Sequence, residues 1–243
     1  MAKRLPPGKC VHCIRFFEKL TWDHVFPKSW YPDTTSPNLE KWKIPSCKPC
    51  NSEYGRLEDD LMIRIGLCLD PNDPKSLGIP QKAVRAISPQ FAKDENDTLL
   101  RDAKCRQILG QASFGHNVPD HGMYPNFGNV FNVPKQNQIA ISISPESVRR
   151  LTEKIVRGIT FIEDSRYIEW PYKVSFYALH DKDAFPVVSL IKRFGKVYAN
   201  EPGIIITRAV LPEDRLTSLY LIDIWGRFKM YGHVGKEGDR LSA

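Results

Sequence analysis

The sequence predicts an α+β protein in which a small metal-stapled module at the N-terminus precedes a larger domain of mixed helices and strands. Three observations support this prediction. Two Cys-x-x-Cys pairs lie in the first 50 residues, apolar residues recur at helical spacing in later segments, and several C-terminal segments have the pattern of strands. We therefore place the module at residues 1–70, a linker with a helix and a long loop at 71–135, and an α+β domain at 136–243.

The module is expected to close with a helix. After Asn51, the residues Leu57, Leu61 and Ile65 recur at helical spacing, and Pro71 stops the pattern. A second helix is expected at residues 97–112. The following residues, 113–135, are rich in Gly, Asn and Pro without periodicity, so we expect a long loop there.

The C-terminal domain alternates strand and helix signals. Residues 138–144 alternate as a strand, and Ser144 or Pro145 then opens a helix. Its apolar stripe consists of Val148, Leu151, Ile155 and Ile159. Further strands are expected within residues 173–179, 203–211 and 218–234.

The composition indicates what kind of partner the chain binds and in which cellular compartment it is expected. The chain has 35 basic and 28 acidic residues, a net charge of +7 that suggests a polyanionic partner. No run reaches the roughly 18 apolar residues of a membrane helix, so we expect no membrane association through a span. The N-terminal residues lack the apolar core of a signal peptide, which predicts a cytoplasmic protein with reduced thiols.

Four of the six cysteines form the two pairs Cys10/Cys13 and Cys47/Cys50, which are 33 residues apart. Two such pairs can supply the four thiolates of a tetrahedral Zn²⁺. Four sulfur ligands leave no position for water, so this zinc is expected to be structural. The alternative is two chance pairs of buried free cysteines, which paired spacing in a reducing compartment disfavours.

The residues between and after these pairs have a recognisable order: Asp23-His24, then Asn38, then Cys47-Lys-Pro-Cys50-Asn51. This order resembles the HNH endonucleases, and in particular their endonuclease VII type with a final Asn. The resemblance covers about residues 8–66. It implies a zinc-stapled ββα-metal (His-Me finger) fold, hydrolysis of DNA to 5′-phosphate and 3′-hydroxyl ends, and a positioning role for Asn38.

The residue types are consistent with that chemistry. A histidine such as His24 is mostly neutral near pH 7 and can accept a proton from water as a general base. Oxygen ligands from Asp23 and Asn51 suit Mg²⁺ or Mn²⁺ as a catalytic cation. Taken singly, His24 can instead be a structural histidine, and Asn51 can be the N-cap of the closing helix.

Basic residues suggest where nucleic acid binds. Lys28 and Lys48 flank the motif, and Arg150, Lys154 and Arg157 recur at i, i+4 and i+7 on the expected C-terminal helix. A solvated helix surface is the alternative for that second group. We expect a metal-dependent DNA endonuclease, with a homodimer possible. A zinc-module adaptor that binds nucleic acid or protein without cleavage, and a nuclease that acts on RNA, are the alternatives.

Overall fold

The computed structural model describes residues 5–37, 39, 42–125, 127, 133–201 and 203–238. The fold is α+β, as predicted, with five α-helices and four small or medium sheets among those residues. The helices are α1 (Lys48–Gly66), α2 (Ile79–Ile87), α3 (Glu95–Gly110), α4 (Pro145–Asp164) and α5 (Asp181–Phe194).

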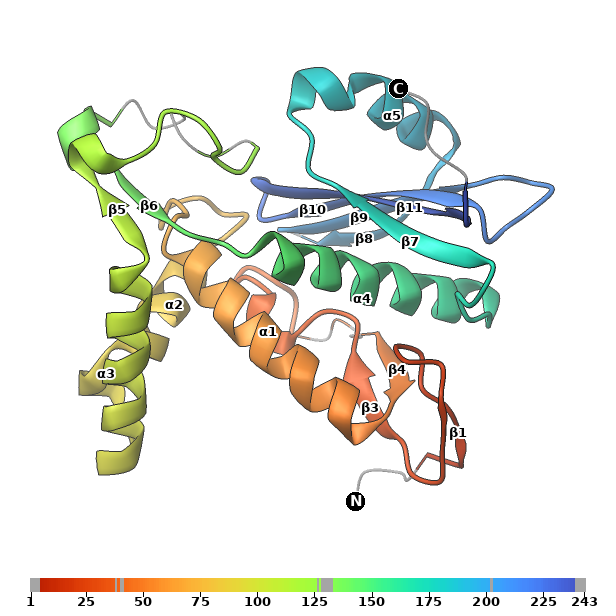
Figure 1. Ribbon diagram of the computed structural model, residues 1–243, viewed down its shortest axis with the longest axis horizontal. Helices are drawn as coiled ribbons and strands as arrows, with labels where there is room; N and C mark the ends of the chain where they lie inside the picture. Colours follow the sequence, from red (N-terminus) through yellow and green to blue (C-terminus); the bar gives the residue numbers. More distant parts are fainter. Residues whose placement is uncertain are drawn as a thin grey trace.

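One five-stranded antiparallel sheet dominates the C-terminal half. Its strands are β7 (Tyr172–Tyr177), β8 (Lys196–Glu201), β9 (Ile204–Val210), β10 (Ser218–Ile224) and β11 (Phe228–Lys236), in the order β7-β11-β10-β9-β8. Helix α4 lies along one face of this sheet and α5 lies on the other (Figure 1). The inner face is apolar because alternate residues of β10, namely Tyr220, Ile222 and Ile224, point toward α4 and are fully buried.

The N-terminal region is built from two hairpins and a helix. The first hairpin pairs β1 (Gly8–Lys9) with β2 (Phe16–Phe17), and the second pairs β3 (Thr21–His24) with β4 (Lys43–Ser46). Helix α1 follows β4 directly, and a further short hairpin, β5 (Ala112–Phe114) with β6 (Ile139–Ile141), joins α3 to α4.

Helix α4 lies between the large sheet and the β3–β4 hairpin, so it is buried on two sides (Figure 1). Gly158 marks the closest approach to the hairpin, because a Cβ at this position would lie 2.8 Å from Val25 Cγ2. On the sheet side the glycine belongs to the strand: a Cβ at Gly232 of β11 would lie 2.8 Å from Val156 Cγ2 of α4. The buried apolar side chains form one cluster that extends from Val11 to Val234.

Most elements lie where the sequence predicts them. Helix α1 begins three residues before Asn51, α3 is shifted two residues toward the N-terminus, and Ser144 caps α4 through its side chain. The segment 218–234 is two strands joined by a turn at Trp225 and Gly226. Helices α2 and α5, strand β8 and the β1–β2 hairpin were not expected. Within the described part of the chain, none of the helices has the length and apolar character needed to cross a bilayer.

Candidate metal centre and adjoining polar cluster

The four paired cysteines come together in space, as predicted. Their sulfur atoms all lie within 4.8 Å of one another, and Cys13 Sγ is 3.9 Å from Cys47 Sγ. A tetrahedral site with Zn–S bonds of about 2.3 Å places sulfurs about 3.8 Å apart, so the cluster has the dimensions of a Cys₄ zinc site. All four are free thiols. Among the described residues this is the only group of three or more Cys, His, Asp or Glu side chains arranged to hold a metal.

Local backbone structure explains how each pair is positioned. In the first pair the chain turns tightly, with the amide of Ile14 donating to the carbonyl of Cys10 at 2.9 Å and Ile14 in the left-handed region at φ 63°. In the second pair, Cys47 is the N-cap residue of α1, and Cys50 lies in the first turn. Burial opposes ionisation of Cys13, but hydrogen bonds from Arg15 outweigh it and lower the pKa of this thiol to about 7. At least one ligand therefore ionises readily.

Asn51 ties the start of α1 to strand β3. Its side-chain amide donates to Thr21 Oγ1 at 3.1 Å and to the carbonyl oxygen of Trp22 at 3.2 Å. The interpretation of Asn51 as an N-cap is wrong, because Cys47 occupies that position and Asn51 lies within the helix. The amide contacts instead fix the hairpin against the helix.

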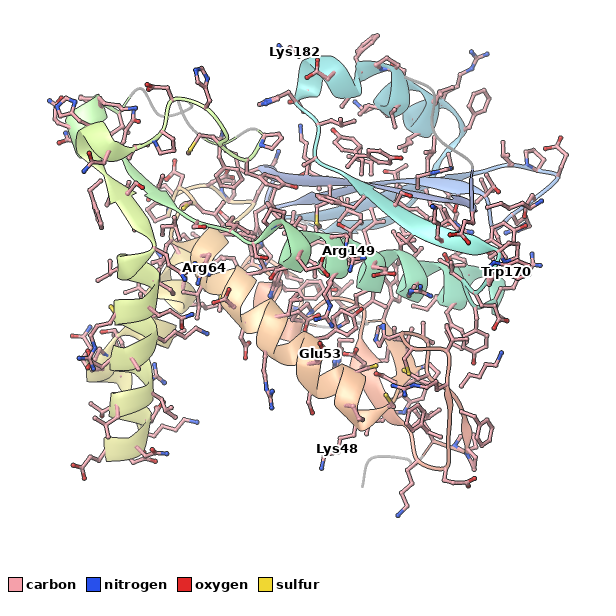
Figure 2. The ribbon with its side chains drawn as sticks, viewed as in Figure 1. Lys48, Glu53, Arg64, Arg149, Trp170 and Lys182 are labelled. Atoms are coloured by element: carbon pink, nitrogen blue, oxygen red, sulfur yellow. The ribbon has the colours of Figure 1, made fainter. Side chains whose placement is uncertain are left out.

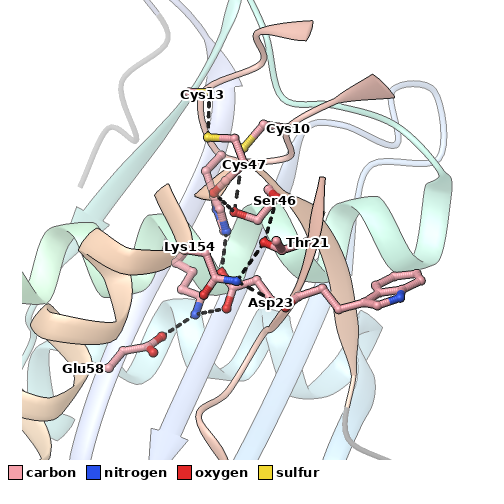
Figure 3. Close-up of polar contacts among 11 residues, drawn as sticks. Cys10, Cys13, Thr21, Asp23, Ser46, Cys47, Glu58 and Lys154 are labelled. Atoms are coloured by element: carbon pink, nitrogen blue, oxygen red, sulfur yellow. Dashed lines mark hydrogen bonds and ion pairs between the residues drawn. The ribbon is translucent and has the colours of Figure 1, made fainter. Parts of the chain in front are cut away.

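Asp23 is buried in a cluster of charged and polar groups (Figure 3). Its Oδ1 accepts from the ammonium of Lys154 at 3.1 Å, and its Oδ2 accepts from Nε2 of His12 at 2.9 Å. The same ammonium also contacts the carboxylate of Glu58 on α1. Tyr54 covers the group, with its ring centroid 4.6 Å from that of His12. One cation from α4 is thus shared by two buried carboxylates.

The protonation states of this cluster follow from its burial. Burial raises the pKa of Glu58 to about 7, despite the neighbouring Lys154 ammonium. Burial also lowers the pKa of His12, although its hydrogen bond to Asp23 acts in the opposite direction. Burial thus favours the neutral forms of both Glu58 and His12, which limits the charge that the interior has to hold.

His24, the next residue along β3, lies in a different environment. It is partly buried, and its Nε2 has no hydrogen-bond partner among the described residues. Burial, then the positive charges of Lys28 and Lys43, lower its pKa. The ring is therefore mostly neutral at physiological pH, and its Nε2 is shielded from solvent as well as unpartnered.

The structure does not bring the expected catalytic cation ligands into a usable arrangement. Both carboxylate oxygens of Asp23 already have hydrogen-bond partners, and the Asn51 amide nitrogen is bound to β3. A Mg²⁺ or Mn²⁺ ion at Asp23 would be placed against the Lys154 ammonium, which is electrostatically unfavourable. The four cysteines could thus hold a metal ion such as zinc, and the contacts of Asp23 give no support to a second metal.

The basic helix face predicted for α4 is corrected by the structure. Lys154 is fully buried and cannot contact a phosphate backbone in this arrangement. Arg150 is paired with Glu53 of α1 at 2.7 Å, and Arg157 donates to the carbonyl of Ile168 and to Glu153. The interpretation of this face as solvent-exposed failed at Lys154, because α4 packs between two layers and the second layer covers part of its polar side.

The remaining predicted residues are distributed as follows. Lys28 and Lys48 are exposed at the start of a short 3-10 helix and of α1, and Figure 2 shows Lys48 at the outer end of that helix. Asn38 lies outside the described residues. Sequence reasoning missed His12, which is 8 % exposed, and Glu58, and it did not anticipate the burial of Lys154.

Comparison with known proteins gives no relative: no family model, no curated protein and no solved structure matches the chain.

Proposed function

We propose that this chain is a nuclease that hydrolyses phosphodiester bonds of DNA, with His24 as the general base. The observation that carries the proposal is the state of His24: a neutral ring beside Lys28 and Lys43 whose Nε2 is unpartnered among the described residues and lies just below the surface, so that water reaches it only after a local shift. The succession of hairpin β3–β4 and helix α1, tied by Asn51 and stapled by four cysteines, supports the HNH resemblance.

The residues of this chain divide the work of hydrolysis. His24 accepts a proton from the attacking water, because its depressed pKa leaves it unprotonated near pH 7. The ammonium groups of Lys28 and Lys43 lie close enough to affect that pKa, so they also lie where they can offset charge that develops on a phosphate. The bound Zn²⁺ would cross-link the two cysteine pairs and so hold β3 in place.

The catalytic Mg²⁺ or Mn²⁺ expected at Asp23 and Asn51 is not built into this mechanism. Asp23 is neutralised by Lys154, and a cation would bind there only if that contact opened. Measuring whether the activity requires added divalent metal therefore tests whether the contact between Lys154 and Asp23 opens.

The same ion pair favours a second candidate function. A module whose key carboxylate is paired with an internal lysine has the properties of an adaptor that keeps the cysteine-stapled fold without cleaving. This adaptor would bind nucleic acid or protein through its exposed basic surface. Its distinguishing property is the absence of any activity that depends on His24.

Cleavage of supercoiled plasmid and of RNA by the purified protein tests these functions. Each substrate is incubated with no added metal, with Mg²⁺, with Mn²⁺ and with EDTA, and zinc content is measured in every sample. We expect nicking of the plasmid, and we expect His24→Ala to reduce its rate by about 10² to 10⁴. The matched control is His116→Ala, which alters an exposed histidine far along the chain.

The outcomes separate the candidates. A His24-dependent cleavage of RNA but not plasmid would assign the activity to RNA. Cleavage that His24→Ala leaves within about tenfold of the original rate would refute His24 as the base. No cleavage of either substrate under any metal condition, in protein that retains its zinc, would favour the adaptor.

A further inference from the structure

A cavity of about 290 Å³ lies where the end of α4 leads into β7, away from His24. Its lining is mainly aromatic and charged: Arg166, Tyr167, Glu169, Trp170, Tyr172 and Leu216. Trp170 is 82 % exposed, the highest exposed fraction among the large hydrophobic side chains of the described residues. Figure 2 shows it at the edge of the molecule, at the end of α4. We call this feature the Trp170 pocket.

Cationic side chains border the rings of the Trp170 pocket. The ammonium of Lys9 lies 5.5 Å from the Tyr167 ring centroid, and that of Lys236 lies 5.8 Å from the Tyr172 ring centroid. Arg166 is exposed at the rim. Aromatic faces with cations at their edges present apolar stacking area together with positive charge, the combination that binds a planar group attached to an anion.

The acidic residues of the pocket offset only part of this charge, because Arg166 and Lys236 remain besides the Lys9–Glu169 pair. Glu169 is paired with Lys9 at 3.0 Å, and Asp214 accepts from the hydroxyl groups of Tyr172 and Thr217 at 2.7 and 2.8 Å. These carboxylates therefore have partners within the protein. Trp170 is left 82 % exposed among the described residues, so its ring face is open for a planar group to stack on.

The Trp170 pocket adjoins the zinc-binding module. The Lys9–Glu169 ion pair and the hydrogen bond from the Tyr167 hydroxyl to the carbonyl oxygen of Lys9, at 3.5 Å, connect it to strand β1. Lys9 directly precedes the zinc-cluster residue Cys10, and its cross-strand partner Phe16 is 64 % exposed. A strand bound in the pocket would thus pass beside the cysteine cluster.

We propose that the Trp170 pocket binds single-stranded nucleic acid by stacking an unpaired base on Trp170, with Lys9, Lys236 and Arg166 facing the backbone phosphates. That this strand belongs to the substrate rests on the nuclease function proposed above. Stacking accepts any base because every base has a π face, so the pocket recognises unpaired structure rather than sequence.

Fluorescence anisotropy tests this proposal without any cleavage. The intact zinc-loaded protein is titrated, with no added divalent metal, into fluorescein-labelled oligothymidylate, oligouridylate and a duplex of similar length. Trp170→Ala should weaken binding to the single strand by about 5- to 150-fold, the range that base–aromatic stacking supplies. Trp170→Phe should keep most of the affinity, since a ring remains.

The matched control is Phe194→Ala. Phe194 is 64 % exposed at the end of α5, with the Arg193 guanidinium 5.0 Å from its ring centroid, so it offers the same kind of ring and cation on another surface. Its loss should leave single-strand affinity unchanged. Lowering salt should strengthen binding in both variants, because the phosphate contacts remain.

Three outcomes would overturn the proposal: equal single-strand affinity in Trp170→Ala and the unaltered protein, binding to the duplex alone, or no nucleic-acid binding while a protein partner requires Trp170. The oligothymidylate and oligouridylate titrations distinguish DNA from RNA strands. Plasmid cleavage that still depends on His24, together with any of these results, would remove the stacking site and leave the nuclease function standing.

Discussion

Replacing Lys154 with methionine removes the one cation shared by two buried carboxylates. Lys154 is fully buried, and the side chains of Asp23 and Glu58 are each only 7 % exposed. Methionine keeps the length and apolar stem of the lysine but leaves Asp23 charged with only its His12 partner. Breaking a buried ion pair from one side costs about 3–5 kcal/mol, because an uncompensated charge remains in the interior.

We therefore expect Lys154→Met to lower the free energy of unfolding by about 3–5 kcal/mol near pH 8. Part of the loss should be recovered near pH 5, because Glu58, whose pKa is already raised to about 7, takes up a proton and ceases to need the ammonium. Urea denaturation at both pH values, followed by tryptophan fluorescence, measures the difference. The control Lys182→Met removes an exposed lysine of α5 (Figure 2) and should change stability by less than about 0.5 kcal/mol.

A companion variant separates charge from packing. Lys154→Met combined with Asp23→Asn and Glu58→Gln removes all three charges and should be more stable than Lys154→Met alone. A loss of under about 1 kcal/mol for Lys154→Met at pH 8, or no recovery in the triple variant, would show that the buried contacts described for Lys154 do not hold the helix to the hairpin.

Two further predictions concern the zinc cluster and the protonation of Glu58. Cys47→Ser should abolish stoichiometric zinc in elemental analysis and sharply lower the unfolding temperature, whereas Cys105→Ser on α3 should change neither; retained zinc in the first variant would refute the Cys₄ assignment. Glu58 has a raised pKa in the folded state, with Lys154, Asp23 and Asp59 as its charged neighbours, so its stabilising contribution is complete below about pH 4.5 and is lost as pH rises through about 7. Glu58→Gln should remove up to about 3 kcal/mol of that pH dependence in denaturation series, and an unchanged slope would contradict the shift.

Local patterns in the sequence identified the elements that have strong periodicity or a cap. The stripe of α4 is buried at Val148, Leu151, Ile155 and Ile159 as predicted, and Ser144 is its N-cap. The cysteine spacing likewise predicted a cluster, because a Cys-x-x-Cys pair positions both sulfurs through local turns. Helix α5 gave no comparable signal, since Pro186 lies inside it and three of its apolar residues, Phe185, Leu190 and Phe194, are exposed.

Contacts between distant segments are what the sequence did not reveal. Lys154 lies beside the apolar stripe of α4, where a lysine ordinarily reaches solvent, and only the hairpin packed against that side turns it inward. The role of Asp23 depends on the same packing, because its partner Lys154 is 131 residues away in the chain. Periodicity shows which residues share one face of a helix. It does not show which element packs against that face, because that depends on the whole fold.

The position of α4 between the sheet and the β3–β4 hairpin affects whether the N-terminal module can be transferred to another protein. Residues 1–70 moved to another chain would lose the wall at Gly158 on which Val25 and Ile44 rest, and would carry Asp23 without its counter-ion. A recipient protein would need a helix with a glycine and a lysine one turn apart in matching places. The transferable unit is therefore the β3–β4 hairpin, α1 and α4 together. A fusion or truncation with its boundary between Cys50 and α4 would divide residues that pack in one core.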